Sequence, residues 1–258
     1  MTTVGSPRVG QRMTFWELIK EHPIEIPIIQ RDYAQGRKNA QEVRTRFVEA
    51  LLGALKENKP LSLDFVYGTQ KEGGPFAPLD GQQRLTTLFL LHWYLASRAD
   101  WSLASRAEQS LFAEFQKVAA NGDACKLSYR TRESSREFFD ELIKNALPKG
   151  TTDVRKWLLD ANWFYRAWLQ DPTVESAITM LEAIHGRVLE GAAGGLFEKL
   201  RPGNGALITF DVLYIDEASA GLFFTADQLL AHDVDIEVDP LSITGVAAGD
   251  GSVRALGD

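Results

Sequence analysis

Five consecutive residues, Asp-Gly-Gln-Gln-Arg at 80–84, combine side chains that suit the binding of a phosphate group. The carboxylate of Asp80 can hold a metal ion, and Gly81 lets the backbone approach a ligand closely. A helix start favours anions, and the guanidinium of Arg84 offers a planar fork of donors. A simple N-cap would explain the acid, but not the two amides and the arginine after it.

A second segment, residues 26–33, places polar side chains after a β-branched run. We expect the run at 24–29 to form a strand, with Pro27 indicating an edge or a bulge. Gln30 can both donate and accept hydrogen bonds, and Arg31 can neutralise phosphate charge. These residues either bind a ligand or are ordinary surface charges after a strand. For this segment alone the second interpretation is favoured, because short motifs are weak evidence.

A third segment, residues 126–136, concentrates basic side chains in a chain whose formal net charge is −7. The total charge does not indicate nucleic-acid binding, so any such contact has to use a local patch. We therefore interpret this segment as a candidate DNA-binding patch, with a solvated helix start as the alternative. Its candidate DNA contacts are Lys126, Tyr129, Arg130, Arg132 and Arg136.

The composition excludes several other chemistries. The single cysteine, Cys125, allows no intrachain disulfide and no cysteine-based zinc site, and the four histidines are far apart. The sequence has no Walker-type phosphate loop, no dinucleotide fingerprint, no His-Glu-x-x-His pair and no nucleophile elbow. It also has no signal region and no apolar run of the roughly 20 residues that a membrane span needs. We therefore expect a cytoplasmic protein.

Hydrophobic periodicity predicts the elements that position these segments. Predicted helices cover 15–21, 40–57, 85–97, 102–119, 134–145, 153–169 and 172–185. We expect the first to begin with a capping box of Thr14 and Glu17, and the last with Asp171 as its N-cap before Pro172. Predicted strands cover 24–29, 63–67, 76–79, 126–130 and 206–215. The helix at 85–97 is apolar almost all round, which places it in the centre of the core.

These elements predict an α+β fold. Of the 258 residues 45% are hydrophobic, which is enough to form the core of one large domain or two small ones. We expect an N-terminal α+β part at 13–100 and a mainly helical part at 101–220. Residues 221–258 contain no aromatic residue after position 232 and are expected to form a disordered or atypical tail.

The first two segments together resemble the N-terminal domain of GmrSD-type restriction endonucleases, which also occurs in SspE proteins that sense phosphorothioate DNA. The resemblance covers roughly residues 13–215, and stretches 65–68 and 129–132 also resemble recurring family stretches. The residues that match the two motifs are Ile26, Pro27, Gln30, Arg31 and Tyr33, followed by the run 79–88.

This resemblance implies a ParB/sulfiredoxin-like core that binds and hydrolyses a nucleoside triphosphate (GTP, UTP, CTP or ATP) with Mg²⁺. In the family this activity is coupled to the recognition of modified phage DNA. The implied catalytic residues are Asp80, Gln83 and Arg84, with Asp80 also assisting the metal. The implied nucleotide-binding residues are Gln30, Arg31, Tyr33, Gly81, Gln82 and Thr86.

The sequence departs from the family pattern in two ways. It contains no His-Asn-His nuclease motif, and the Asn-Ala-Arg-Gly segment expected after 206–215 is not recognisable. We therefore expect DNA cleavage to need a separate nuclease domain or subunit. Two alternatives stay open, a nucleotide- and DNA-binding switch without significant turnover and a regulatory scaffold protein. The sequence also leaves open whether the chain forms a homodimer.

Overall fold

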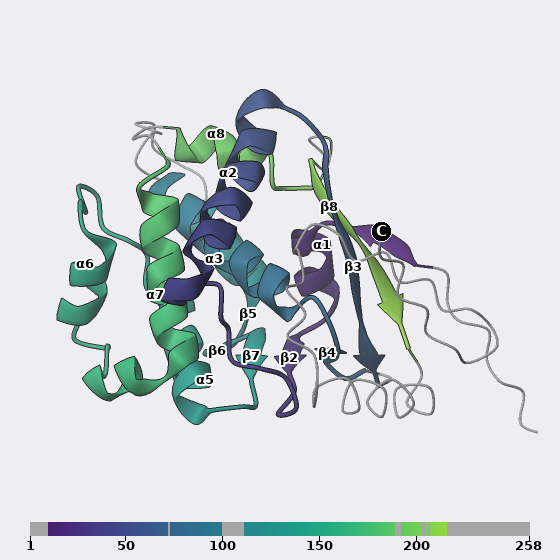
Figure 1. The fold of residues 1–258 in the computed structure, drawn as a ribbon, viewed down its shortest axis with the longest axis horizontal. Helices are drawn as coiled ribbons and strands as arrows, with labels where there is room; N and C mark the ends of the chain where they lie inside the picture. Colours follow the sequence, from purple (N-terminus) through teal and green to yellow (C-terminus); the bar gives the residue numbers. More distant parts are fainter. Residues whose placement is uncertain are drawn as a thin grey trace, which may run out of the picture.

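The protein has an α+β fold in which helices gather on one side of a mixed β-sheet (Figure 1). The computed structural model describes residues 10–71, 73–99, 111–188, 192–202, 205 and 207–215. The α+β fold class predicted from the sequence is confirmed. The predicted tail at 221–258 and the first part of the helix predicted at 102–119 lie outside the described residues.

Six strands form the main sheet in the order β1-β8-β3-β4-β2-β7. They are β1 (Gln11–Met13), β2 (Ile24–Ile26), β3 (Leu61–Gln70), β4 (Phe76–Pro78), β7 (Leu127–Tyr129) and β8 (Ile208–Tyr214). Strand β2 lies between β4 and the edge strand β7 and runs parallel to both, with Ile24 paired with Phe76 of β4 and with Leu127 of β7. The carboxyl ends of these three strands therefore lie at one edge of the sheet.

The remaining pairings complete a mixed sheet. Strand β3 is antiparallel to β4 and parallel to β8, and β1 is antiparallel to β8. A separate two-stranded sheet joins β5 (Ala120–Asn121) and β6 (Ala124–Cys125). Both β7 and β8 come from the part of the sequence expected to be mainly helical, and they share one sheet and one hydrophobic core with the N-terminal strands.

Eight helices pack with this sheet among the described residues. They are α1 (Phe15–Glu21), α2 (Gln41–Glu57), α3 (Gln82–Ala99), α4 (Leu111–Ala119), α5 (Glu133–Lys144), α6 (Val154–Asp160), α7 (Pro172–His185) and α8 (Ala193–Glu198). Two short 3₁₀ turns, η1 (Lys38–Ala40) and η2 (Arg166–Gln170), connect them. Helix α1 begins with a capping box, because Thr14 and Glu17 each accept a backbone N–H from the other.

Helix α3 is the central helix of the core and packs against α4, α7 and α8. Its middle turns are buried on all sides, with Leu85, Phe89 and Trp93 fully enclosed. This position confirms the prediction. The helix begins at Gln82, three residues before the apolar run, because hydrophobicity marks the buried part of a helix and not its polar first turn.

Other predicted elements also differ in extent, and the strand predicted at 63–67 is longer in the structure, where β3 runs from Leu61 to Gln70. The strand predicted at 24–29 ends at Ile26, and the chain then turns so that the N–H of Gln30 donates to the carbonyl of Pro27 (3.0 Å). Strand β2 lies inside the sheet, so the edge position suggested by Pro27 was also wrong. Proline has no N–H to donate to a neighbouring strand, and β2 ends just before it.

The tryptophan-rich helix predicted at 153–169 is interrupted. Helix α6 ends at Asp160, and the chain re-forms a 3₁₀ turn only from Arg166 to Gln170. The three tryptophans still pack with the core, as expected, with Trp168 buried and Trp157 and Trp163 partly buried against it. Trp157 stacks on Trp93 of α3, Trp163 lies edge-on to Trp157, and Trp168 is buried beside Phe138.

Candidate functional site

The three polar segments of the sequence follow three neighbouring parallel strands. Residues 30–33 follow β2, residues 80–84 follow β4, and residues 130–132 follow β7. Because β4, β2 and β7 are adjacent and parallel, all three segments leave the sheet at the same edge. Ligands of open sheets commonly bind outside the carboxyl ends of parallel strands, so this edge is the candidate site.

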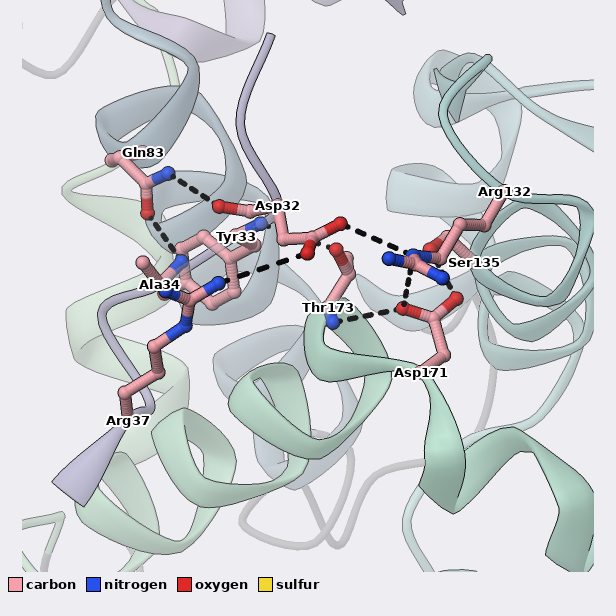
Figure 2. Close-up of polar contacts among 9 residues, drawn as sticks. All are labelled: Asp32, Tyr33, Ala34, Arg37, Gln83, Arg132, Ser135, Asp171 and Thr173. Atoms are coloured by element: carbon pink, nitrogen blue, oxygen red, sulfur yellow. Dashed lines mark hydrogen bonds and ion pairs between the residues drawn. The ribbon is translucent and has the colours of Figure 1, made fainter. Parts of the chain in front are cut away.

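The loop after β2 is held by the side-chain amide of Gln83, in the first turn of α3. The amide nitrogen donates to the carbonyl of Asp32 (3.1 Å), and the amide oxygen accepts from the N–H of Ala34 (2.8 Å) (Figure 2). A second link comes from Gln30, whose amide nitrogen donates to the carbonyl of Leu79 (2.6 Å). The two motifs that the sequence places about 50 residues apart are therefore joined directly.

Two successive threonines of α3 hold two buried tyrosines. The hydroxyl of Thr86 lies 2.6 Å from that of Tyr129, and the hydroxyl of Thr87 lies 2.7 Å from that of Tyr33. Burial raises the pKa of both tyrosine hydroxyls far above 10, so both stay neutral. Tyr33 also donates its backbone N–H to Thr173 of α7 (3.1 Å). One turn of α3 thus fixes both the loop after β2 and strand β7.

Asp80 and Arg84 form an ion pair at the start of α3. A guanidinium nitrogen of Arg84 donates to the carboxylate of Asp80 (2.8 Å) and to the carbonyl of Phe65 (2.6 Å). The side chain of Arg84 is 14% exposed, whereas that of Asp80 is 39% exposed. The carboxylate is therefore open to solvent, and the guanidinium is fixed in direction.

Strand β3 is bulged where it meets Arg84. The pairing with β8 shifts by one residue between Ser62 and Phe65, and Asp64 has a φ of 21°. A bulge bends a strand and redirects the groups next to it. The carbonyl of Phe65, immediately after the bulge, is the one that Arg84 contacts.

Gly81 makes the turn that leads into α3. Its φ is +89°, and a Cβ atom here would lie 2.7 Å from a methyl carbon of the buried Val66. Only glycine fits this position. Its carbonyl accepts the N–H of Leu85 (2.9 Å), so the first N–H groups of α3 have no partner one turn earlier in the chain.

Gln82 and Arg31, one from each motif, have polar groups without a hydrogen-bond partner among the described residues. The amide oxygen of Gln82 is buried and has no hydrogen-bond partner within the described part of the chain. Arg31 is exposed and makes no hydrogen bond or ion pair with any described residue. Arg31 and the open carboxylate of Asp80 are therefore accessible to a ligand, whereas the amide oxygen of Gln82 is enclosed.

Asp32 connects the loop after β2 with the basic segment. Its carboxylate lies between two guanidinium groups, 3.2 Å from Arg132 and 3.7 Å from Arg37 (Figure 2). Arg132 also lies 3.8 Å from the buried Asp171, which caps α7 by accepting the N–H of Thr173 (2.9 Å). The hydrogen bond to Asp32 and the charges of both acids raise the pKa of Arg132.

The other basic side chains of the third segment also have partners. Arg130 pairs with Glu25 (3.5 Å), and Arg136 pairs with Glu133 on its own helix (3.0 Å). Lys126 donates to the carbonyls of Ile19 (3.2 Å) and Lys20 (3.4 Å). The three arginines at 130, 132 and 136 are exposed, whereas Tyr129 is buried beneath them, so the arginines form the accessible surface of this segment.

Sequence reasoning missed four residues of this arrangement. Asp32 was interpreted as an ordinary surface charge, and Thr173 was not singled out, because their partners lie about 100 residues or more away. Arg37 carried no signal beyond its charge. Asp171 was predicted as a helix cap from its place before Pro172, which is confirmed, but its proximity to Arg132 had no local signature.

The carboxylate of Asp80 is the predicted metal ligand. No group of three or more histidine, cysteine, aspartate or glutamate side chains in the described ranges lies close enough to hold a metal ion. Mg²⁺ in nucleotide sites usually binds one or two carboxylates together with phosphate oxygens and water. A single open carboxylate therefore fits a Mg²⁺ ion that arrives with a nucleotide.

These features define an α+β domain in which two polar motifs meet at the carboxyl edge of parallel strands. The chain matches the family model described as GmrSD restriction endonuclease, N-terminal domain, over residues 15–223, and it belongs to this family. Membership implies a role in a restriction system. No curated protein matches the chain. None of the helices in the described ranges is long and apolar enough to cross a membrane.

Proposed function

We propose that this domain binds and hydrolyses a nucleoside triphosphate with Mg²⁺ and couples this reaction to the recognition of modified DNA in a restriction system. The observation that carries the proposal is the direct hydrogen bonding between the two polar motifs, through Gln83 and Gln30, at the start of α3. This joins the exposed Arg31 and the fixed Arg84 in one assembly. Family membership supports the restriction setting.

The phosphates bind at the N-terminal end of α3 in this proposal. Unpaired N–H groups and the helix dipole favour anions there. Arg84 stabilises negative charge from a fixed direction, and Arg31 adds a second positive charge. Asp80 holds Mg²⁺, which neutralises phosphate charge when it is bound. The buried amide oxygen of Gln82 has no partner among the described residues and accepts a hydrogen bond from a bound water molecule.

Several predicted contact residues have a supporting part in this proposal. The side-chain polar atoms of Gln83 are paired with the backbone of the loop, and the hydroxyls of Tyr33 and Thr86 are paired inside the core. These three residues position the loop and α3 relative to one another. Tyr129 acts in the same way for the basic segment, by anchoring β7 to Thr86.

DNA contact is assigned to the exposed arginines of the third segment. Arg130, Arg132 and Arg136 each pair with a carboxylate in the free protein, and a DNA phosphate can replace that carboxylate with similar geometry. The sequence contains no nuclease motif, so cleavage is assigned to a separate nuclease domain or subunit.

Phosphate release tests the proposal. The purified chain is incubated with Mg²⁺ and each of ATP, GTP, CTP and UTP, with and without modified phage DNA. We expect turnover of at least one nucleotide, and a loss of about 100-fold or more in Arg84→Ala and Asp80→Ala. Arg46→Ala is the matched control, because Arg46 is an exposed arginine on α2 that pairs with Glu42 on the same helix and lies outside the candidate site. Full turnover in both site variants would contradict the proposal.

A nucleotide-binding switch without significant turnover is the second candidate. It is favoured by the ion pair between Asp80 and Arg84, which engages the one carboxylate of the motif in the free protein. Nucleotide binding measured by calorimetry, with no phosphate release in the presence of modified DNA, would support this function over hydrolysis.

A further inference from the structure

We propose that the guanidinium of Arg132 binds either Asp32 or a DNA phosphate. When DNA binds, its phosphate displaces Asp32 from Arg132 and thereby loosens the loop after β2. This inference rests on the proposed DNA contact of the basic segment. It goes further by naming the ion pair through which bound DNA changes the candidate nucleotide site. Asp32 is a positioning residue in this scheme and does not touch either ligand.

The ion pair is built so that it can be exchanged. Arg132 is 48% exposed, so a phosphate can reach it, and only one of its N–H groups contacts Asp32. A phosphate oxygen pair can engage a guanidinium with two parallel hydrogen bonds, which gives it an advantage over this single contact. Asp32 is only 19% exposed and cannot move out with Arg132 without moving the loop.

The departure of Arg132 leaves Asp32 with a weaker partner. Arg37 lies 3.7 Å from the carboxylate, farther than the 3.2 Å contact that is lost. The other acid beside Arg132 is not affected in the same way, because Asp171 already accepts hydrogen bonds from Ser134, Ser135 and the N–H of Thr173. The change in charge balance is therefore concentrated on Asp32.

The backbone around Asp32 connects this carboxylate to the candidate nucleotide site. Its carbonyl accepts from Gln83, and the next two N–H groups, of Tyr33 and Ala34, donate to Thr173 and Gln83. A shift of Asp32 strains all three contacts, which hold the loop that carries Arg31. The less neutralised carboxylate also repels the phosphates of a nucleotide. Bound DNA and bound nucleotide therefore weaken each other, by the same factor in each direction.

Amide hydrogen exchange, followed residue by residue by nuclear magnetic resonance, tests this coupling in the full chain. We expect a short DNA duplex to speed the exchange of the Tyr33 and Ala34 amides by about two- to tenfold, the effect of one modest polar contact. Arg132→Gln should show the faster exchange without DNA, and no further response to DNA. Asp32→Asn, which keeps the shape of the side chain, should lose the response as well.

Arg46→Gln is the matched control. Arg46 is an exposed arginine of α2 that pairs with Glu42 on its own helix and lies outside the basic segment, so its loss should leave both the DNA-free exchange of the loop and the response to DNA unchanged. The proposal is overturned if the duplex binds without changing the exchange rates of the Tyr33 and Ala34 amides, or if no duplex binds. It is also overturned if the exchange rates in Asp32→Asn respond to DNA as they do in the wild type. The measurement uses no nucleotide, so its outcome is separate from the presence or absence of hydrolysis.

Discussion

Replacement of Gly81 by alanine perturbs the turn that places the second polar motif at the start of α3. The backbone has a φ of +89° here, which L-residues rarely adopt, at a cost of about 1–2 kcal/mol. The added Cβ would also lie 2.7 and 3.1 Å from the two methyl carbons of Val66, which is fully buried and has no room to move. Such overpacking costs about 1–3 kcal/mol. We therefore expect the free energy of unfolding to fall by about 2–5 kcal/mol.

Urea unfolding, followed by tryptophan fluorescence, measures this loss. Gly53→Ala is the matched control, because a Cβ at Gly53 meets nothing within 4 Å and the residue lies inside α2. Alanine there should stabilise the protein by about 0.5–1 kcal/mol. Val66→Ala introduced into Gly81→Ala should cost less than it does in the wild type, because it removes the clash. A Gly81→Ala protein within about 0.5 kcal/mol of the wild type would refute the reasoning.

Three further predictions concern buried polar contacts. Burial lowers the pKa of His92 to about 4, below its ordinary 6.5. As the pH falls, the unfolded state therefore takes up the proton before the folded state does, and the free energy of unfolding should decrease by roughly 2 kcal/mol from about pH 7 to about pH 5. His92→Leu should remove this pH dependence, measured by urea unfolding at each pH. Gln83→Glu keeps an acceptor for Ala34 but loses the donor to the loop, which should cost about 1–3 kcal/mol by thermal unfolding. Asp171→Ala removes a helix cap and the hydrogen-bond acceptor of two serines, and should lower the free energy of unfolding by about 2–4 kcal/mol. Asp171→Asn should lie between the wild type and Asp171→Ala. Equal stability of Asp171→Asn and Asp171→Ala would contradict the role of Asp171 as a cap.

Local signals in the sequence predicted the elements around the site. The capping box at Thr14 and the Asp171-Pro172 pair mark the helix starts that the structure has, because caps depend on residues within one turn. The central position of α3 followed from its apolar composition. Wrong extents arose where tertiary packing replaced a local pattern, as in the interrupted helix predicted at 153–169.

The assembly of the site had no local signature. It depends on β4, β2 and β7 lying side by side in parallel, and hydrophobic periodicity does not encode strand order. The clamp by Gln83 and the ion pair between Asp32 and Arg132 join residues about 50 and 100 positions apart. Residue type alone indicated that Gln83 and Arg132 were polar groups of interest, but not which groups they would contact.

Calorimetric titration with Mg²⁺ and each of the four nucleoside triphosphates tests most directly whether the two motifs form one nucleotide site. We predict that the wild type binds at least one of them with one molecule per chain. Arg84→Ala should weaken this binding by about 10- to 100-fold, the effect of losing a hydrogen bond from a charged group. Equal affinity in both proteins, or no binding of any nucleotide by the wild type, would contradict a nucleotide site at the start of α3.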